Sequence, residues 1–278
     1  MKKISRRSFM AAAAVSVAAL ALTACGGSAS SVASSVASSA ASSVAASSAA
    51  AAELTTVEAG KLTMATNAAF PPYEMTTDAG EFEGIDVDTA KAIAEKLGLE
   101  LQIDDMDFDA ALLSVQQGKA DIVMAGVTVT DVRKAVMDFS DSYATGIQSI
   151  IVPNDSEIAS PDDLAGKTIG TQRGTTGYIY CSDDFGDENV VAYDDGLTAV
   201  QALNNGQVDA VVIDNAPAQE FVAANPGLKV LDTSYAEEDY AIGMAKGSAL
   251  EDAVNKALEE LKADGTLQAI VDKYINAN

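Results

Sequence analysis

Residues Asp121 to Ser140 read DIVMAGVTVTDVRKAVMDFS, and this stretch combines a fold signal with a candidate ligand contact. The apolar run from Ile122 to Ala125 predicts a buried strand that ends at Gly126. Three residues typical of turns and helix N-caps follow it: Thr128, Thr130 and Asp131. We therefore expect a strand, a break and a short helix that carries Arg133.

Arg133 has two interpretations. A guanidinium next to a strand end with hydroxyls and backbone amides is a good receptor for a carboxylate, because arginine binds that group through two parallel hydrogen bonds. The alternative is a solvated surface arginine on a short helix. The local sequence leaves both interpretations open.

A second copy of the same pattern supports the ligand interpretation. Residues 115–123 (VQQGKADIV) and 203–211 (LNNGQVDAV) share a helix end, a glycine cap, an aspartate and a buried strand. The first strand leads to Gly126 and Thr128, and the second leads to Asp214. Since ligands of open α/β sheets bind outside the carboxyl ends of strands, two such units facing each other would form a cleft. Arg133 on one side and Asp214 on the other would suit a zwitterion.

Strands and helices alternate through the rest of the chain, which predicts an α/β fold. Lys61 to Thr66 is expected to be a strand, and an apolar face from Val87 to Leu97 is expected to be a helix that ends at Gly98. Helices are also expected from Ala110 to Gln117 and from Leu267 to Tyr274. Leu250, Val254, Leu258 and Leu261 lie at helical spacing and are expected to face the core.

The N-terminus resembles a bacterial lipoprotein signal. Basic residues at positions 2, 3, 6 and 7 precede twelve apolar or small residues from Ala11 to Leu22, and Leu22-Thr23-Ala24 leads to Cys25. We expect a signal sequence at 1–24, lipidation of Cys25 and a Ser/Ala-rich tether at 25–60. The paired arginines also fit a twin-arginine export motif, so the export route stays open.

Composition narrows the function classes. The formal net charge is −24, and removing residues 1–24, with four basic and no acidic residues, makes it −28. Such a charge disfavours nucleic acid and anionic lipid headgroups. The chain contains no histidine, which rules out Ser-His-Asp and Cys-His catalysis and histidine-containing zinc sites. We expect no enzyme activity, no cofactor, no metal and no nucleic-acid partner.

Four segments in this order resemble the periplasmic-type solute-binding proteins of amino-acid ABC importers, in the polar amino acid group. The segments are Thr66–Tyr73 (TNAAFPPY) with Gly84–Asp88 (GIDVD), Ala125–Lys134 (AGVTVTDVRK) with Asp138–Ser140 (DFS), Gln172–Gly177 (QRGTTG), and Val208–Asp214 (VDAVVID). The resemblance covers residues 61 to 274.

The resemblance implies a two-lobed periplasmic-binding-protein fold with two hinge crossings and a ligand cleft between the lobes. The first lobe would comprise 61–142 with 240–278, and the second 143–239. The crossings are expected near Ser142 to Ile147 and Ala236 to Tyr240. Closure of the lobes over an amino acid would present it to a membrane permease. The protein is expected to be a monomer held by Cys25 at the outer face of the cell membrane.

The resemblance also implies a site. Arg133 would bind the α-carboxylate, helped by amides or hydroxyls of Thr128 and Thr176. Asp214 and the Gly126 carbonyl would receive the α-ammonium. Four further residues complete the expected lining: Phe70 and Phe108 around the ligand side chain, and Asn67, Gln172 and Thr175. Asp214 is also placed to cap the following helix, expected from Ala216 to Ala223.

Two departures from the family pattern bear on the ligand. Asn67 stands where several relatives carry an aspartate, and Ile213 stands where the glutamine-binding type has a histidine. A lysine or arginine ligand would then lack a counter-charge, so the resemblance favours a neutral polar amino acid such as glutamine, histidine or cystine. Two alternatives stay open on the same fold: a cyclohexadienyl-type dehydratase and a ligand-sensing module.

Overall fold

The computed structural model describes residues 54–275. The expected signal sequence, Cys25 and nearly all of the expected tether lie outside these residues. Among the described helices, none has the length and apolar character needed to cross a membrane.

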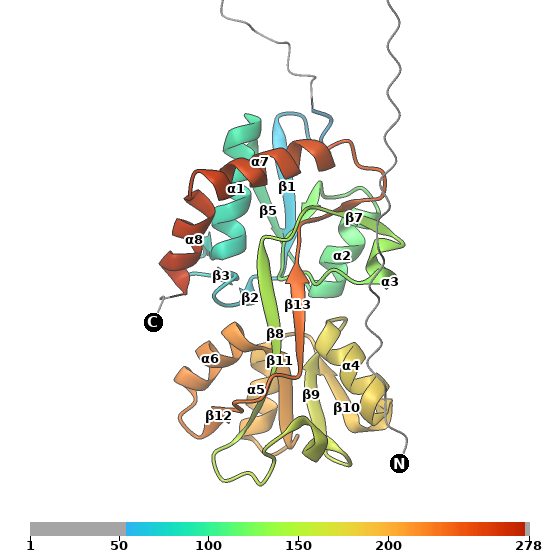
Figure 1. Cartoon of the computed structure of the whole chain (residues 1–278), viewed down its shortest axis with the longest axis vertical. Helices are drawn as coiled ribbons and strands as arrows, with labels where there is room; N and C mark the ends of the chain where they lie inside the picture. The colour runs from blue at the N-terminus through green and yellow to red at the C-terminus, as the bar shows by residue number, and fades with distance from the viewer. Residues whose placement is uncertain (1–53, 276–278) are drawn as a thin grey trace, which may run out of the picture. The chain divides into compact units, whose positions relative to one another are not determined.

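The first lobe is built on a five-stranded sheet (Figure 1). In sheet order its strands are β5 (Glu100–Asp105), β1 (Lys61–Thr66), β6 (Ile122–Val123), β14 (Gly243–Ala245) and β7 (Met137–Phe139). Its helices are α1 (Ile85–Leu97), α2 (Phe108–Gln116), α3 (Asp131–Lys134), α7 (Glu251–Ala263) and α8 (Thr266–Tyr274). β1 pairs in parallel with β5 and β6, whereas β14 is antiparallel to β6 and β7. Residues from both ends of the described chain thus share one sheet.

Helices cover both faces of this sheet. Leu62 and Met64 of β1 pack with Ile93 of α1 in one hydrophobic cluster, and Ala65 packs with Phe108 of α2 in another. The alternation follows from the period of two in a strand. A separate small sheet, β2 (Ala69–Phe70), β3 (Glu74–Thr76) and β4 (Phe82–Glu83), lies beside α1.

The second lobe is built on a six-stranded sheet. Its strands are β10 (Val190–Tyr193), β9 (Ile169–Gln172), β11 (Ala210–Asp214), β8 (Ala144–Pro153) and β12 (Leu228–Val230) in sheet order, with β13 (Ala236–Tyr240) also paired to β8. Its helices are α4 (Thr176–Phe185), α5 (Gly196–Asn204) and α6 (Asn215–Ala224), with 3₁₀ turns at Pro161–Leu164 and Asp187–Asn189. Along β11, Val211 and Ile213 belong to one hydrophobic cluster and Ala210 and Val212 to another, so this sheet too is buried on both faces.

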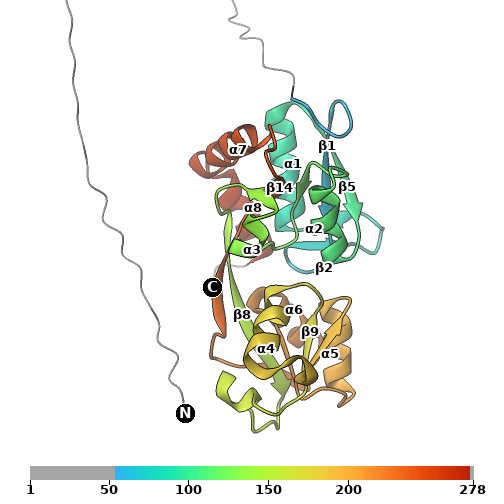
Figure 2. The same ribbon diagram turned by 90° about the vertical axis from the view of Figure 1, so that its right-hand side faces the viewer.

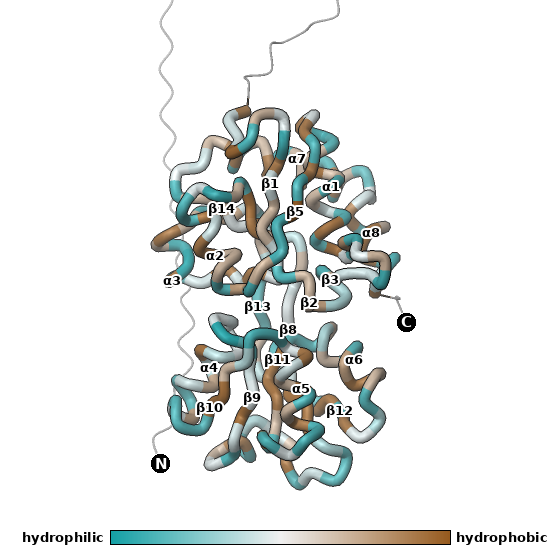
Figure 3. The backbone as a smooth tube through the Cα atoms, turned by 180° about the vertical axis from the view of Figure 1, so that it is seen from behind, coloured by the Kyte–Doolittle hydropathy of each residue, from teal (hydrophilic) through white to brown (hydrophobic). Residues whose placement is uncertain are grey.

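Two strands connect the lobes. β8 and β13 pair antiparallel from Ala144↔Tyr240 to Gln148↔Ala236, and they run side by side between the lobes (Figures 1 and 2). In Figure 3, β13 is hydrophilic, whereas β11 in the centre of the second sheet is hydrophobic. The polar strand β13 therefore contrasts with the apolar centre of the sheet to which it is attached.

The sequence pattern shared by residues 115–123 and 203–211 forms the same local structure in both lobes. α2 and α5 each end just before a glycine with positive φ, Gly118 (φ 66°) and Gly206 (φ 68°), and each leads into a buried strand. α2 begins at Phe108, two residues before the expected start at Ala110, and Asp107 occupies the N-cap position without a side-chain capping hydrogen bond. The strand expected from Ile122 to Ala125 is shorter than predicted, since only Ile122 and Val123 pair with neighbours.

Candidate functional site

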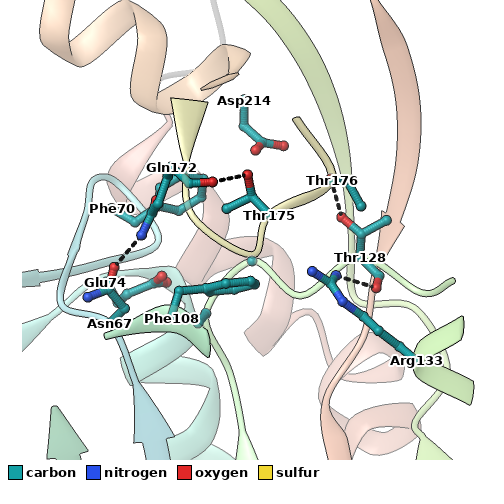
Figure 4. Close-up of a pocket in the computed structure, with 12 residues that line it drawn as sticks. Asn67, Phe70, Glu74, Phe108, Thr128, Arg133, Gln172, Thr175, Thr176 and Asp214 are labelled. Atoms are coloured by element: carbon teal, nitrogen blue, oxygen red, sulfur yellow. Dashed lines mark hydrogen bonds between the residues drawn. The ribbon is translucent and has the colours of Figure 1, made fainter. Parts of the chain in front are cut away.

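All ten residues expected at the site line one pocket between the lobes (Figure 4). The expected residues are Asn67, Phe70, Phe108, Gly126, Thr128, Arg133, Gln172, Thr175, Thr176 and Asp214, and the structure adds Glu74 and Ala125. The cavity between them measures about 10 Å³, which is room for about one water molecule. The walls must therefore move apart before an amino acid can enter.

The pocket lies where strands end. Asn67 follows β1, Gly126 follows β6 after a short break, Gln172 ends β9, and Asp214 ends β11. Carboxyl ends of strands from both sheets thus converge on one place. This is where an open α/β sheet offers polar groups to a ligand.

Arg133 is a buried guanidinium, not a solvated surface charge. Thr130 caps α3 by accepting a hydrogen bond from the Arg133 amide, and the side chain is only 8% exposed. Its Nη1 donates to the Thr128 carbonyl at 2.8 Å, and its Nη2 donates to the Gly174 carbonyl at 3.1 Å. The guanidinium carbon lies 5.4 Å from the centre of the Phe108 ring. Burial lowers the pKa of Arg133, and nearby Glu238 opposes this shift. The group stays charged, because arginine is not deprotonated in proteins.

Asp214 is a buried carboxylate at the end of β11. It accepts hydrogen bonds from Gln148 Nε2 at 2.8 Å and from the Tyr240 hydroxyl. Burial raises its pKa to about 7, although the Tyr240 hydrogen bond acts in the opposite direction. Asp214 occupies the N-cap position of α6, as expected, but its side chain makes no capping hydrogen bond. The Asp214 carboxylate is instead hydrogen-bonded to Gln148 and Tyr240.

Thr128 and Thr176 use their hydroxyls within the protein. Both hydroxyls donate to Oε2 of Glu238, at 3.0 Å and 2.9 Å. Both hydroxyls are therefore already hydrogen-bonded to Glu238. The backbone amides of Thr128 and Thr176 are better suited to help Arg133 bind a carboxylate. Glu238 was not among the expected residues, because only the structure shows that Glu238 and Tyr240 are the buried residues of β13.

Glu74 is the second buried acid at the site that was not among the expected residues. Its side chain is only 1% exposed, lines the pocket, and has neither oxygen hydrogen-bonded within residues 54–275. Burial and nearby Asp86 raise its pKa well above the ordinary range. Asp86, in turn, accepts from the Gly126 amide at 3.0 Å and the Tyr143 hydroxyl at 2.8 Å. Nothing in the local sequence distinguishes Glu74 from a solvated acid.

Asn67 and Gln172 hydrogen-bond to each other across the pocket. Gln172 Nε2 donates to Asn67 Oδ1 at 2.8 Å, and Asn67 Nδ2 donates to the Met106 carbonyl at 3.0 Å. Thr175 caps α4 by accepting from the Tyr178 amide, and its hydroxyl donates to the Gln172 carbonyl. The side-chain oxygen of Thr175 therefore has a local structural role.

Residues 54–275 contain no group of three or more metal-ligating side chains placed to hold an ion. Cys181 is buried, and burial raises its pKa to about 12.

Known proteins resemble this chain over nearly all of the described residues. The family model of bacterial extracellular solute-binding proteins, family 3, matches residues 62–277. The L-cystine-binding protein TcyJ of Escherichia coli is 32% identical, over 80% of this chain and 85% of that protein. A probable histidine-binding protein of Neisseria gonorrhoeae is 33% identical, over 95% of this chain and 94% of that protein. Among solved structures, the arginine-, lysine-, histidine-binding protein ArtJ of Geobacillus stearothermophilus matches with a TM-score of 0.75 and 34% identity, over 78% of this chain and 96% of ArtJ. The chain belongs to the bacterial extracellular solute-binding proteins, family 3.

Proposed function

We propose that this protein is the substrate-binding component of an ABC importer, which captures a free amino acid by closing two lobes over it. It is a binding protein and not an enzyme. The observation that carries the proposal is the pairing of Arg133 and Asp214, two buried side chains of opposite charge that line one pocket from different lobes. A free amino acid carries the complementary pair of charges at a fixed separation.

The α-carboxylate binds the guanidinium of Arg133, whose five N–H groups exceed the two carbonyl contacts that it makes. Backbone amides at Thr128 and Thr176 complete the receptor for this group. The α-ammonium binds Asp214 and the Gly126 carbonyl. Phe70 and Phe108 enclose the ligand side chain, and Asn67, Gln172 and Thr175 line the same pocket.

The amide pair of Asn67 and Gln172 favours a neutral polar ligand: glutamine, histidine or cystine. Each amide both donates and accepts, so together they can exchange their mutual hydrogen bond for bonds to an uncharged polar side chain. The names of the cystine-binding and histidine-binding relatives agree with this class.

Glu74 favours a second candidate, an amino acid with a positively charged side chain. Ionised Glu74 without hydrogen bonds is costly to bury, which is why its pKa is raised, and a guanidinium or ammonium would supply both the counter-charge and the donors that favour the ionised form. The name of the structural relative ArtJ agrees with this candidate. The two candidates differ in one property, the net charge of the ligand.

A thermal-shift screen of the twenty amino acids, cystine and ornithine tests the proposal and separates the candidates. A true ligand at 100 times its dissociation constant is expected to stabilise the protein by about 2.7 kcal/mol. Glutamine, histidine or cystine at the top of the ranking supports the neutral class, and arginine, lysine or ornithine supports the cationic class. No stabilisation by any of these compounds contradicts amino-acid capture.

The same screen on the Glu74→Gln variant assigns the role of Glu74. If the ligand is cationic, the variant is expected to lose most of the stabilisation, because the carboxylate that pairs with the side chain is gone. If the ligand is neutral, the ranking is expected to stay unchanged. Glu83→Gln, an exposed acid on β4, is the matched control.

We further propose that the mature protein is a monomer outside the cytoplasm, held at the outer face of the cell membrane by lipid on Cys25 and serving a membrane permease. The support is the pattern of basic, apolar and small residues before Cys25. A thioether-linked diacylglycerol carries two acyl chains, which is enough for firm retention. In detergent phase partition, wild-type protein is expected in the detergent phase and Cys25→Ser in the aqueous phase. Equal partition of the two contradicts the anchor.

A further inference from the structure

Glu238 lies at the centre of a hydrogen-bond network that joins the two lobes. One oxygen, Oε2, accepts from three donors: the Thr128 hydroxyl at 3.0 Å, the Thr176 hydroxyl at 2.9 Å and Gln148 Nε2 at 3.0 Å. The side chain is 6% exposed and does not line the ligand pocket. Glu238 is therefore not one of the groups that would touch the ligand.

The donors come from three parts of the fold: the first lobe, the second lobe and a crossing strand. Thr128 lies between β6 and α3 of the first lobe, and Thr176 is the first residue of α4 in the second lobe. Gln148 and Glu238 lie on the two crossing strands, β8 and β13. The three donors can converge on one atom only when the lobes are together.

The two lobes also meet directly at this point. The hydroxyls of Thr128 and Thr176 are 3.4 Å apart, across the line where the lobes separate. Glu238, anchored on the crossing strand, cannot follow both threonines when they move apart. Opening must therefore break at least one of its two hydroxyl contacts.

Burial makes these contacts strong. Hydrogen bonds to a charged acceptor in a site of low dielectric are stronger than those between neutral groups. The second oxygen of Glu238, Oε1, has no hydrogen-bond partner within residues 54–275, so Oε2 provides all the hydrogen bonding of this carboxylate. Burying the charge of Glu238 is therefore least costly when all three donors are hydrogen-bonded to Oε2.

We propose that Glu238 is a latch that holds the lobes closed, a positioning residue that sets the equilibrium between the open and closed arrangements. Gln148 extends the latch to the ligand pocket, because its Nε2 also donates to Asp214 at 2.8 Å. The proposal rests on lobe closure as stated under the proposed function. It adds a contact that favours closure without touching the ligand.

Distance measurements between spin labels test the latch in the absence of any ligand. Labels are placed at Val132→Cys on α3 and Ile179→Cys on α4, both exposed, in full-length protein with Cys25→Ser. Figures 1 and 2 show α3 and α4 on the same side of the protein, one in each lobe. Cys181 is buried and stays unlabelled. Pulsed electron paramagnetic resonance then reports the populations of short and long distances.

Glu238→Ala is expected to lower the ratio of short to long distances by about tenfold or more, the effect of losing one charge-assisted hydrogen bond on an equilibrium constant. Glu238→Gln, which keeps an acceptor oxygen but loses the charge, is expected to lower the ratio less. Glu237→Gln, the exposed neighbour on β13, is the matched control and is expected to leave the ratio unchanged.

A wild-type distance distribution in Glu238→Ala overturns the latch, as does an equal shift in Glu237→Gln. If circular dichroism shows that the alanine variant does not fold, Glu238→Gln decides in the same way. The ligand screen on wild-type protein tests amino-acid capture independently. Failure of the latch and failure of the proposed function are therefore distinguishable.

Discussion

Replacing Arg133 with alanine is expected to weaken amino-acid binding by about 2 to 5 kcal/mol, which is the range for truncating one partner of a buried charge pair. The guanidinium is 8% exposed, and two carbonyls and the Phe108 ring hold it in place. Its removal leaves the ligand carboxylate buried without a counter-charge. Isothermal titration calorimetry with the ligand found in the screen measures the loss.

Arg173→Ala is the matched control for this experiment. Arg173 is an exposed arginine one residue after Gln172, and its weak contacts are with Ala192 and Asp194 at the surface. We expect its removal to leave affinity within a few tenths of a kcal/mol, as for most surface substitutions. Unchanged affinity in Arg133→Ala would show that the carboxylate binds elsewhere.

Replacing Asp214 with asparagine is expected to weaken binding of α-amino acids by about 2 to 5 kcal/mol while leaving their deaminated analogues almost unaffected. Asparagine has nearly the same shape and removes the charge. Its single oxygen can accept from either Gln148 or Tyr240, which bind different oxygens of Asp214, and its NH2 group can donate to the Tyr240 hydroxyl instead. The ammonium loses its counter-charge, and an analogue without an ammonium loses nothing. Calorimetry on both compounds gives the difference, and Asp183→Asn on the exposed surface of α4 is the control.

The pH dependence of binding is a second readout of Asp214. Burial raises the pKa of Asp214 to about 7, so the carboxylate becomes protonated and neutral as the pH falls below that value. Binding an ammonium requires the ionised form, and affinity for the amino acid should therefore fall by up to about tenfold per pH unit below pH 7. In Asp214→Asn this dependence should vanish. Equal losses for the amino acid and its deaminated analogue would contradict the ammonium role.

Local sequence was enough to predict the parts of the fold that depend on local signals. Gly98 stops α1 in a left-handed conformation (φ 71°), and the helix-glycine-strand pattern at Gly118 and Gly206 recurs in three dimensions. The apolar residues of α7 at helical spacing, such as Val254 and Leu258, are buried as expected. These signals lie within about one or two helical turns, along the sequence, of the residues whose structure they determine.

The site was predictable in its lining but not in its internal hydrogen bonds. The ten expected residues line one pocket because they follow strand ends that the fold brings together. Glu74 and Glu238 escaped prediction because an acid in a chain of 41 acidic residues is usually a solvated one. Their burial depends on partners 12 to 110 residues away, Asp86 and Thr128, which no local pattern reveals.

β8 is a single uninterrupted strand of ten residues, Ala144–Pro153. Its first half pairs with β13 between the lobes, and its second half pairs with β11 and β12 inside the second sheet. The connection between the lobes is therefore a two-stranded ribbon that is continuous with the second sheet, and not a pair of loops. Hydrogen bonds between the two strands restrict how this ribbon can bend and twist, and we expect them to limit the directions in which the lobes move relative to one another. The same continuity couples the interior of the second sheet to the ribbon: repacking around Ile150 or Ile151, neither of which lines the pocket, should change the angle at which the lobes come to rest.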